Sequence, residues 1–226
     1  MRYQEIEGNL ITLALEGMFD VIAHGCNCQC KMGAGLAPQM AEAFGCDEFY
    51  KEIVSYKGYD EDGVDYEVTT NNKGNINKLG TIDYKLQYLW FNHPILKRED
   101  YKFKSFAMTH RSVGQEDVQE LVVVNAYTQF MYGTNHADGV SKPLDYEALT
   151  LCLRKMNHIF KGKHIGLPLI GCHLAGGVWD YTKINKKTNE GINLYRRFSN
   201  NQLKDVKTII QEELKDCDVT IVHFKK

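Results

Sequence analysis

Residues 21–36 read Val21-Ile-Ala-His-Gly-Cys-Asn-Cys-Gln-Cys-Lys-Met-Gly-Ala-Gly-Leu36, an apolar run followed by a polar, glycine-bearing turn. The apolar run is bounded by Asp20 and by turn residues, as is typical of a buried strand. A helical pattern begins near Leu36. A glycine pair between a strand and a helix lets the main chain approach a ligand and directs helix N-terminal N–H groups at an anion. The stretch therefore predicts a phosphate-binding turn, although glycine and alanine are also ordinary turn residues at such a junction.

Further apolar runs predict strands at 121–124, 165–170 and 219–224, and helical spacing predicts helices at 36–44, 146–160 and 203–214. Strands that alternate with helices predict an α/β fold, in which helices cover both faces of a sheet. The segment 56–106 interrupts this alternation, although 81–90 alternates as a strand does. We interpret 56–106 as an insertion with a hairpin and loops, within a single domain that spans 1–226.

Length and composition favour one intracellular domain with a small ligand. The chain has 226 residues, 43% of them hydrophobic, and a net charge of -2, so it lacks the basic footprint of a protein that binds long nucleic acids. It contains no long apolar run and no apolar signal core at its N-terminus. We therefore expect a cytoplasmic protein with no membrane partner. The seven cysteines form no paired CxxC clusters, which indicates reduced thiols.

A second glycine-bearing loop follows the strand expected at 165–170. It reads Leu169-Ile-Gly-Cys-His-Leu-Ala-Gly-Gly-Val-Trp-Asp180. Glycines at the carboxyl end of a parallel strand provide a flexible lip of main-chain amides. Two such lips, one from each loop, are expected to hold a diphosphate from both sides.

Three motifs together resemble macro domains: Glu7-Gly-Asn-Leu, the loop of 22–37 and the segment 167–177. The likeness extends from about residue 5 to 224, outside 56–106. It is strongest to a branch with bacteriophage-encoded and yeast members and glutamyl-ADP-ribose hydrolases, and it suggests a phage or bacterial source. The resemblance implies a three-layer α/β/α fold with a mixed central sheet, no cofactor, and ADP-ribose or ADP-ribose 1″-phosphate as the ligand.

The resemblance also implies which residues contact the nucleotide. Asn9 occupies the position of an aspartate that reads the adenine amino group in many macro domains, and Asn27 matches an asparagine at the distal ribose. Phe224 matches an aromatic residue that stacks on adenine, or else is a core aromatic. The remaining implied ligand-binding residues lie in the two loops: Gly33, Ala34, Gly35, Leu36, Gly171, Cys172, Leu174, Ala175, Gly176, Gly177 and Val178.

The reaction is expected to differ from that of lysine-dependent hydrolases. Those enzymes use a lysine and an aspartate, at positions held here by Gln129 and Ala175, which form no imine and transfer no proton. In the yeast-like branch, which resembles ADP-ribose 1″-phosphate phosphatases, a histidine matches His24. With an ordinary pKa near 6.5, His24 would protonate a leaving group or orient water; the alternative is a buried structural histidine. His173, inside the second loop, is a further catalytic candidate whose side chain points toward ligand or solvent.

Two other functions stay open from the sequence: an ADP-ribosyl hydrolase acting on protein or nucleic acid, and a binding module without catalysis. Cys26, Cys28 and Cys30 alternate near His24, but the family pattern accounts for this stretch without a metal, and we expect none. A basic cluster is either a solvated surface or a surface that attracts an ADP-ribosylated nucleic acid or a phosphorylated substrate. It consists of Lys183, Lys186, Lys187, Arg196 and Arg197.

Overall fold

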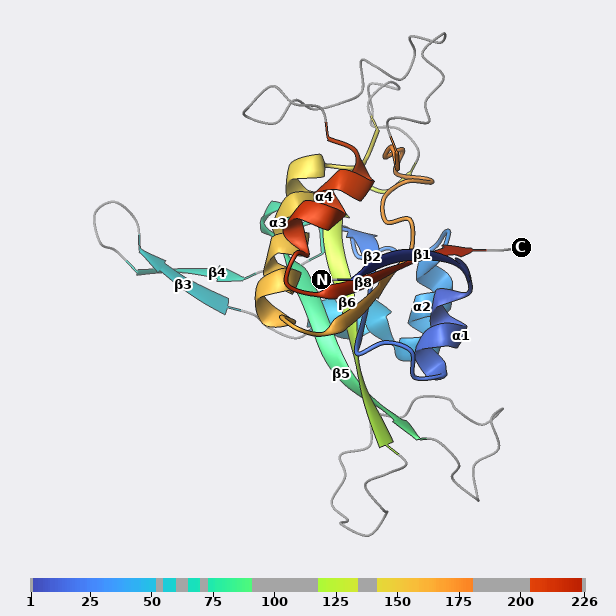
Figure 1. The fold of residues 1–226 in the computed structure, drawn as a ribbon. Helices are drawn as coiled ribbons and strands as arrows, with labels where there is room; N and C mark the ends of the chain where they lie inside the picture. The colour runs from blue at the N-terminus through green and yellow to red at the C-terminus, as the bar shows by residue number, and fades with distance from the viewer. Residues whose placement is uncertain are drawn as a thin grey trace, which may run out of the picture.

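The computed structural model describes residues 2–51, 55–59, 65–69, 73–90, 118–133, 142–180 and 204–224. These residues contain a six-stranded sheet in the order β1-β8-β7-β2-β6-β5 (Figure 1). Neighbouring strands are parallel except β5 and β6, which are antiparallel. The mixed sheet agrees with the architecture expected from the resemblance. The strands are β1 (Tyr3–Gly8), β2 (Val21–Asn27), β5 (Ile82–Trp90), β6 (Val118–Gln129), β7 (His164–Leu167) and β8 (Asp218–Phe224).

Helices cover both faces of this sheet. Helices α1 and α2 lie on one face, and α3 and α4 lie on the other (Figure 1). The predicted α/β class is thereby confirmed. The α-helices are α1 (Leu10–Leu15), α2 (Ala37–Phe44), α3 (Tyr146–Ile159) and α4 (Val206–Glu213), and the 3-10 helices are η1 (Cys46–Lys51) and η2 (Ile76–Lys78).

Strand β2 explains why the opening sequence run is continuously apolar. Val21 and Ala23 pack in the core beneath α3 and α4, whereas Ile22 packs in the core beneath α1 and α2. Successive side chains of a strand point to opposite faces, so a strand covered on both sides needs apolar residues at every position.

The interpretation of 56–106 as one insertion needs correction, because β5 belongs to the central sheet and pairs with β6 along its whole length. Only β3 (Ser55–Tyr59) and β4 (Asp65–Thr69) form a separate hairpin, as the sequence predicts (Figure 1). At the edge of the sheet, β5 leaves Tyr84, Leu86 and Tyr88 exposed. This alternation is shared by edge strands and isolated hairpins, which is why the sequence does not separate them. Residues 91–106 lie outside the described part.

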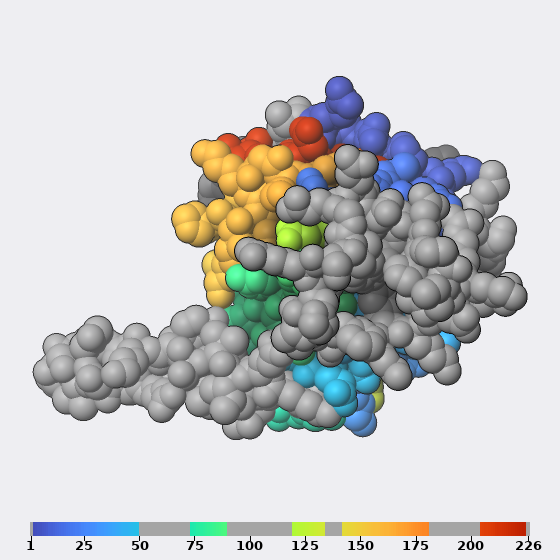
Figure 2. Space-filling model, turned by 90° about the horizontal axis from the view of Figure 1, so that it is seen from below, coloured from blue at the N-terminus to red at the C-terminus, as the bar shows by residue number. Residues whose placement is uncertain are grey.

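Helix α3 packs on the face of the sheet beside the edge strand β5. Segments 142–180 and 73–90 adjoin on the face shown in Figure 2. The rings of Tyr84 and Phe160 meet edge to face with centroids 5.4 Å apart. Among the helices that the structure describes, none combines the length and the apolar character needed to cross a bilayer.

Candidate functional site

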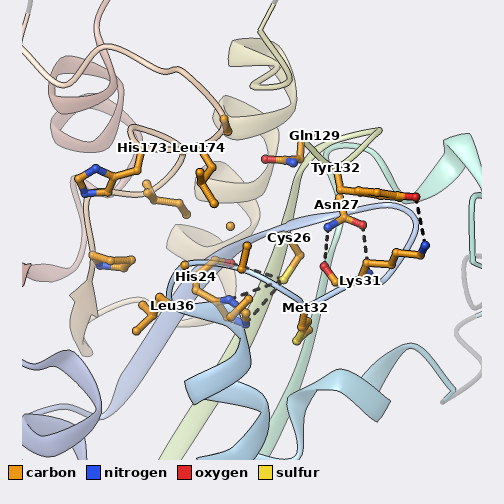
Figure 3. Close-up of a pocket in the computed structure, with 18 of the residues that line it drawn as sticks. His24, Cys26, Asn27, Lys31, Met32, Leu36, Gln129, Tyr132, His173 and Leu174 are labelled. Atoms are coloured by element: carbon orange, nitrogen blue, oxygen red, sulfur yellow. Dashed lines mark hydrogen bonds between the residues drawn. The ribbon is translucent and has the colours of Figure 1, made fainter. Parts of the chain in front are cut away.

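A pocket of about 560 Å³ lies where the parallel strands β2, β6 and β7 end. Both glycine-bearing loops line it (Figure 3). A Cβ atom added to Gly35 would lie 3.7 Å from Cδ1 of Leu174, so the loops approach each other closely. The carboxyl ends of parallel strands are the usual ligand site of open α/β sheets. The fold therefore brings together two loops that are separated by more than a hundred residues of sequence.

The pocket includes most, but not all, of the residues predicted for the site. Those that line it are His24, Asn27, Gly33, Ala34, Gly35, Leu36, Gly171, His173, Leu174 and Ala175. Those that do not line it are Asn9, Cys172, Gly176, Gly177, Val178 and Phe224. Contact with a ligand stays a prediction for all of them.

The second loop needs its glycines for close packing. Gly171 has φ of 72°, in the left-handed region that favours glycine. A Cβ atom on Gly177 would lie 2.8 Å from the carbonyl oxygen of Gly171, and it would also overlap Leu144. Gly177 is therefore needed for the close packing of the loop against Gly171 and Leu144, and it does not line the pocket.

The N-terminus of α2 faces the pocket through residues 33–37. The N-cap residue Leu36 makes no side-chain capping hydrogen bond, and Pro38 lies in the first turn. The first N–H groups of a helix have no partner within the helix, and the helix dipole favours an anion beside them. This end of α2 is thus suited to a phosphate group.

His24 is buried and neutral. Its side chain extends from β2, and Nε2 lies 2.8 Å from Oδ1 of Asn125. Because Nδ2 of Asn125 donates to the carbonyl oxygen of Cys46 at 2.7 Å, the amide oxygen faces the ring and Nε2 carries the proton. Burial lowers the pKa of His24 from 6.5 to about 4, against the opposing effect of the Asn125 hydrogen bond. The expected pKa near 6.5 is therefore wrong. At neutral pH the His24 ring is uncharged, so it cannot act as a general acid that protonates a leaving group.

Asn27 uses its side chain to close a turn. Its Nδ2 donates to the carbonyl oxygen of Lys31 at 2.7 Å, and its Oδ1 accepts from the main-chain N–H of Lys31 at 3.1 Å. Both amide atoms are thereby engaged with the chain itself. The predicted contact with a distal ribose is untested; the second N–H of Nδ2 and the second lone pair of Oδ1 are not used by these two bonds.

Two predicted adenine contacts lie outside the pocket. Oδ1 of Asn9 caps α1 by accepting from Ile11 N and Thr12 N. Phe224 is 59% exposed at the end of β8, so the alternative interpretation as a core aromatic is wrong. Stacking of Phe224 on adenine stays a prediction. The basic cluster within 183–197 lies outside the described residues.

The alternating cysteines are buried thiols. Cys26, Cys28 and Cys30 pack around Tyr127 in a small core. Burial raises the pKa of the Cys28 thiol to about 12 and also raises the pKa of Cys26. These thiols therefore stay protonated at neutral pH and serve as packing groups.

Lys31 and Tyr132 line the pocket although the sequence did not single them out. Lys31 Nζ donates to the hydroxyl of Tyr132 at 3.1 Å and lies 4.5 Å from the centroid of its ring. Tyr132 follows β6 in an irregular segment, where no periodic pattern assigns a side chain to a site. Among the described residues that line the pocket, none is aspartate or glutamate.

Comparisons with known proteins show which other chains this protein is similar to. No protein-family model matches the chain. One relative is an uncharacterised 17.5 kDa protein of the tk–vs intergenic region of Enterobacteria phage T4. The two chains are 27% identical over 179 residues, and the alignment covers 77% of this chain and 81% of the phage protein. A structure from Bacteroides thetaiotaomicron aligns with a TM-score of 0.54 at 17% identity, covering 98% of this chain and 99% of the other. Because the two sequences are only 17% identical, this similarity shows a shared fold alone.

Solved macro domains are also among the structures to which this chain is similar. The macro domain of Thermus aquaticus DarG aligns with a TM-score of 0.46 at 15% identity, covering 99% of this chain and 98% of the other.

Proposed function

We propose that this protein binds ADP-ribose in the pocket between its two glycine-bearing loops and hydrolyses the terminal phosphate of ADP-ribose 1″-phosphate there. One observation carries the proposal: the two loops that resemble macro-domain motifs line a single pocket together with the N-terminus of α2. The pocket volume of about 560 Å³ also lies within the ~300–1,000 Å³ of small-molecule sites.

The charge of the pocket supports an anionic ligand. In the described part of the chain, its lining contains Lys31 and two histidines but no carboxylate. A diphosphate placed there would meet main-chain N–H groups and a cation, without repulsion from an acidic side chain.

His24 would act in this reaction as a neutral group. Water attacks the terminal phosphorus, the bond from phosphorus to the oxygen on C1″ breaks, and that oxygen takes up a proton from solvent. Because Nε2–H of His24 is directed at Asn125, Nδ1 is the nitrogen that can accept a hydrogen bond. The Cys26 sulfur lies 3.9 Å from Nδ1, and in the reaction water would take the place of the thiol as the donor to this nitrogen. Asn27 contributes by holding the turn that ends at Lys31. The products are inorganic phosphate and ADP-ribose.

A phosphate-release assay with ADP-ribose 1″-phosphate tests the proposal. We expect turnover by the wild type and a loss of at least about tenfold in His24→Gln, as for other groups that assist proton transfer. The exposed His158 on α3 provides a matched control, and His158→Gln should retain full turnover. The rate should rise as the pH passes through about 4 and then stay level, because neutral His24 is the active form. A rate that falls above pH 6.5 would instead require a protonated histidine.

Binding without turnover is the second candidate. The neutral state of His24 and the lack of a carboxylate among the described lining residues favour it. Calorimetry with ADP-ribose, combined with release assays on ADP-ribose 1″-phosphate, ADP-ribosylated protein and ADP-ribosylated DNA, separates the candidates. Binding without release from any substrate supports the second, and absence of ADP-ribose binding overturns both.

A further inference from the structure

The pocket carries a positive charge at one end. Lys31 and Tyr132 lie together at the end of the lining opposite to His173 (Figure 3). The Lys31 ammonium donates to the Tyr132 hydroxyl at 3.1 Å. Among the described residues that line the pocket, Lys31 is the one lysine or arginine, and none of the ion pairs between described residues involves it.

The main chain of Lys31 is held in place by several hydrogen bonds. Asn27 bonds to both its N–H and its carbonyl group. Three positions earlier in the same turn, Cys28 donates its N–H to the carbonyl oxygen of Gln129 at 3.0 Å and accepts from Gly74 N at 2.8 Å. The turn 27–31 is thus fixed to β6 and to the segment before η2, and Lys31 extends from a preorganised support rather than from a loose surface loop.

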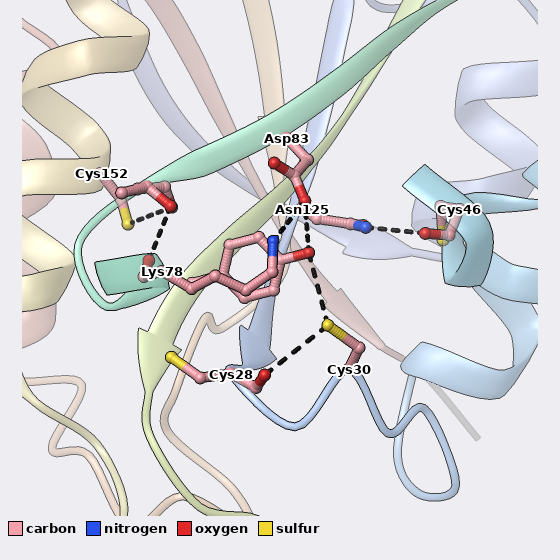
Figure 4. A network of polar contacts seen from close by, with 9 residues as sticks. Cys28, Cys30, Cys46, Lys78, Asp83, Asn125 and Cys152 are labelled. Carbon is pink, nitrogen blue, oxygen red and sulfur yellow. Dashed lines mark hydrogen bonds and ion pairs between the residues drawn. The ribbon is translucent and has the colours of Figure 1, made fainter. Parts of the chain in front are cut away.

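A buried polar network supports the same turn from below (Figure 4). Cys30 has φ of 53°, which is unusual for a residue other than glycine, and its thiol lies 3.9 Å from the hydroxyl of Tyr127. That hydroxyl donates to Asp83 at 2.5 Å, and Asp83 also pairs with Lys78 at 3.1 Å. A residue in a sparsely populated backbone conformation persists only where its surroundings hold it there. This network holds Cys30 in its conformation.

The strand order, combined with the adenine contacts that the resemblance implies, indicates which part of a nucleotide would reach Lys31. The expected adenine contacts are Asn9, directly after β1, and Phe224, the last residue of β8, whereas Gln129 and Tyr132 lie at the β6 side of the sheet. The loops that would hold the diphosphate follow β2 and β7, between these two sides. A nucleotide laid out in this order places its distal ribose, with the substituent on C1″, beside Lys31.

We propose that Lys31 and Tyr132 recognise a phosphate group on the distal ribose, so that the pocket prefers ADP-ribose 1″-phosphate to ADP-ribose. This inference rests on the proposed function, and it names the residues that select the substrate. An ammonium has three N–H donors, and the bond to Tyr132 uses one. The tyrosine hydroxyl accepts from Lys31 and can donate its own proton to a phosphate oxygen. Charge-assisted hydrogen bonds of this kind are stronger than neutral ones.

Calorimetric dissociation constants for ADP-ribose and ADP-ribose 1″-phosphate test the inference. They are measured in His24→Gln as the reference protein, because this variant is expected to turn over the phosphorylated ligand slowly, and each further substitution is made in that background. We expect the reference protein to bind the phosphorylated ligand at least about tenfold more tightly, and Lys31→Gln to lose most of this preference through weaker binding of that ligand. Lys31→Arg keeps the charge and should keep most of the preference. Tyr132→Phe should reduce it severalfold. Lys161→Gln changes an exposed lysine beyond α3 and should leave both dissociation constants unchanged.

The outcomes distinguish failure of this inference from failure of the proposed function. A reference protein that binds ADP-ribose but shows no preference overturns this inference alone, and so does a Lys31→Gln variant that keeps the preference. Equal weakening of both ligands in Lys31→Gln, with thermal unfolding unchanged, assigns Lys31 to general binding and also overturns the selective role. A wild type that binds neither ligand overturns the proposed function itself.

Discussion

Lys78 and Asp83 form a buried ion pair beneath the turn that presents Lys31. Their side chains are 0% and 7% exposed, and Nζ lies 3.1 Å from Oδ2. At this distance and an effective dielectric constant of about 20, the attraction is about 5 kcal/mol, and the removal of both charges from water opposes it. Loss of one partner leaves the other charge buried without its counterion. Such a loss costs about 3–5 kcal/mol.

We therefore predict that Lys78→Met lowers the free energy of unfolding by about 3–5 kcal/mol, measured by urea denaturation. Lys207→Met is a matched control, because it removes a pair with Glu5 of similar length, 2.8 Å, whose side chains are 29% and 24% exposed. That change should cost at most about 1 kcal/mol. The double variant Lys78→Met/Asp83→Asn removes both charges and should recover part of the loss. Equal costs for Lys78→Met and Lys207→Met would refute the reasoning.

Three further predictions follow from burial, close packing and exposure. The pKa of His24 is about 4 in the folded chain and 6.5 when unfolded, so the unfolded chain binds more protons between these values and stability falls as the pH is lowered through that window. The stability lost across this window is about 3 kcal/mol, at about 1.4 kcal/mol per pKa unit. The free energy of unfolding of His24→Gln should therefore depend less on pH than that of the wild type, and an equal dependence in both proteins would contradict the pKa assigned to His24. Gly177→Ala places a Cβ atom 2.8 Å from the Gly171 carbonyl oxygen and should lower stability by about 1–3 kcal/mol in thermal unfolding, so wild-type stability would argue against a close-packed loop. Phe224→Ala should change stability by less than about 0.5 kcal/mol, because the ring is exposed, but should weaken ADP-ribose binding in calorimetry by about 1–3 kcal/mol if adenine stacks there.

Elements with a local signature could be predicted from the sequence. Helix α3, expected at 146–160, is found at Tyr146–Ile159, because its apolar spacing and the Asp145 cap are both encoded within a few residues. Strand β1 and helix α1 were not predicted. The side chains of β1 are intermediate or exposed at every position, as at the edge of a sheet, and α1 has six residues, too few to establish a period.

The sequence by itself determined the alternation of strands and helices and the two glycine-bearing loops, because turn chemistry and hydrophobic periodicity depend on neighbouring residues. The tertiary structure decided the state of the site. His24 loses its charge through burial and bonds to Asn125, 101 positions away, and Lys31 meets Tyr132 across another 101 positions. Such pairings depend on which strands become neighbours in the sheet, and no local pattern encodes that order.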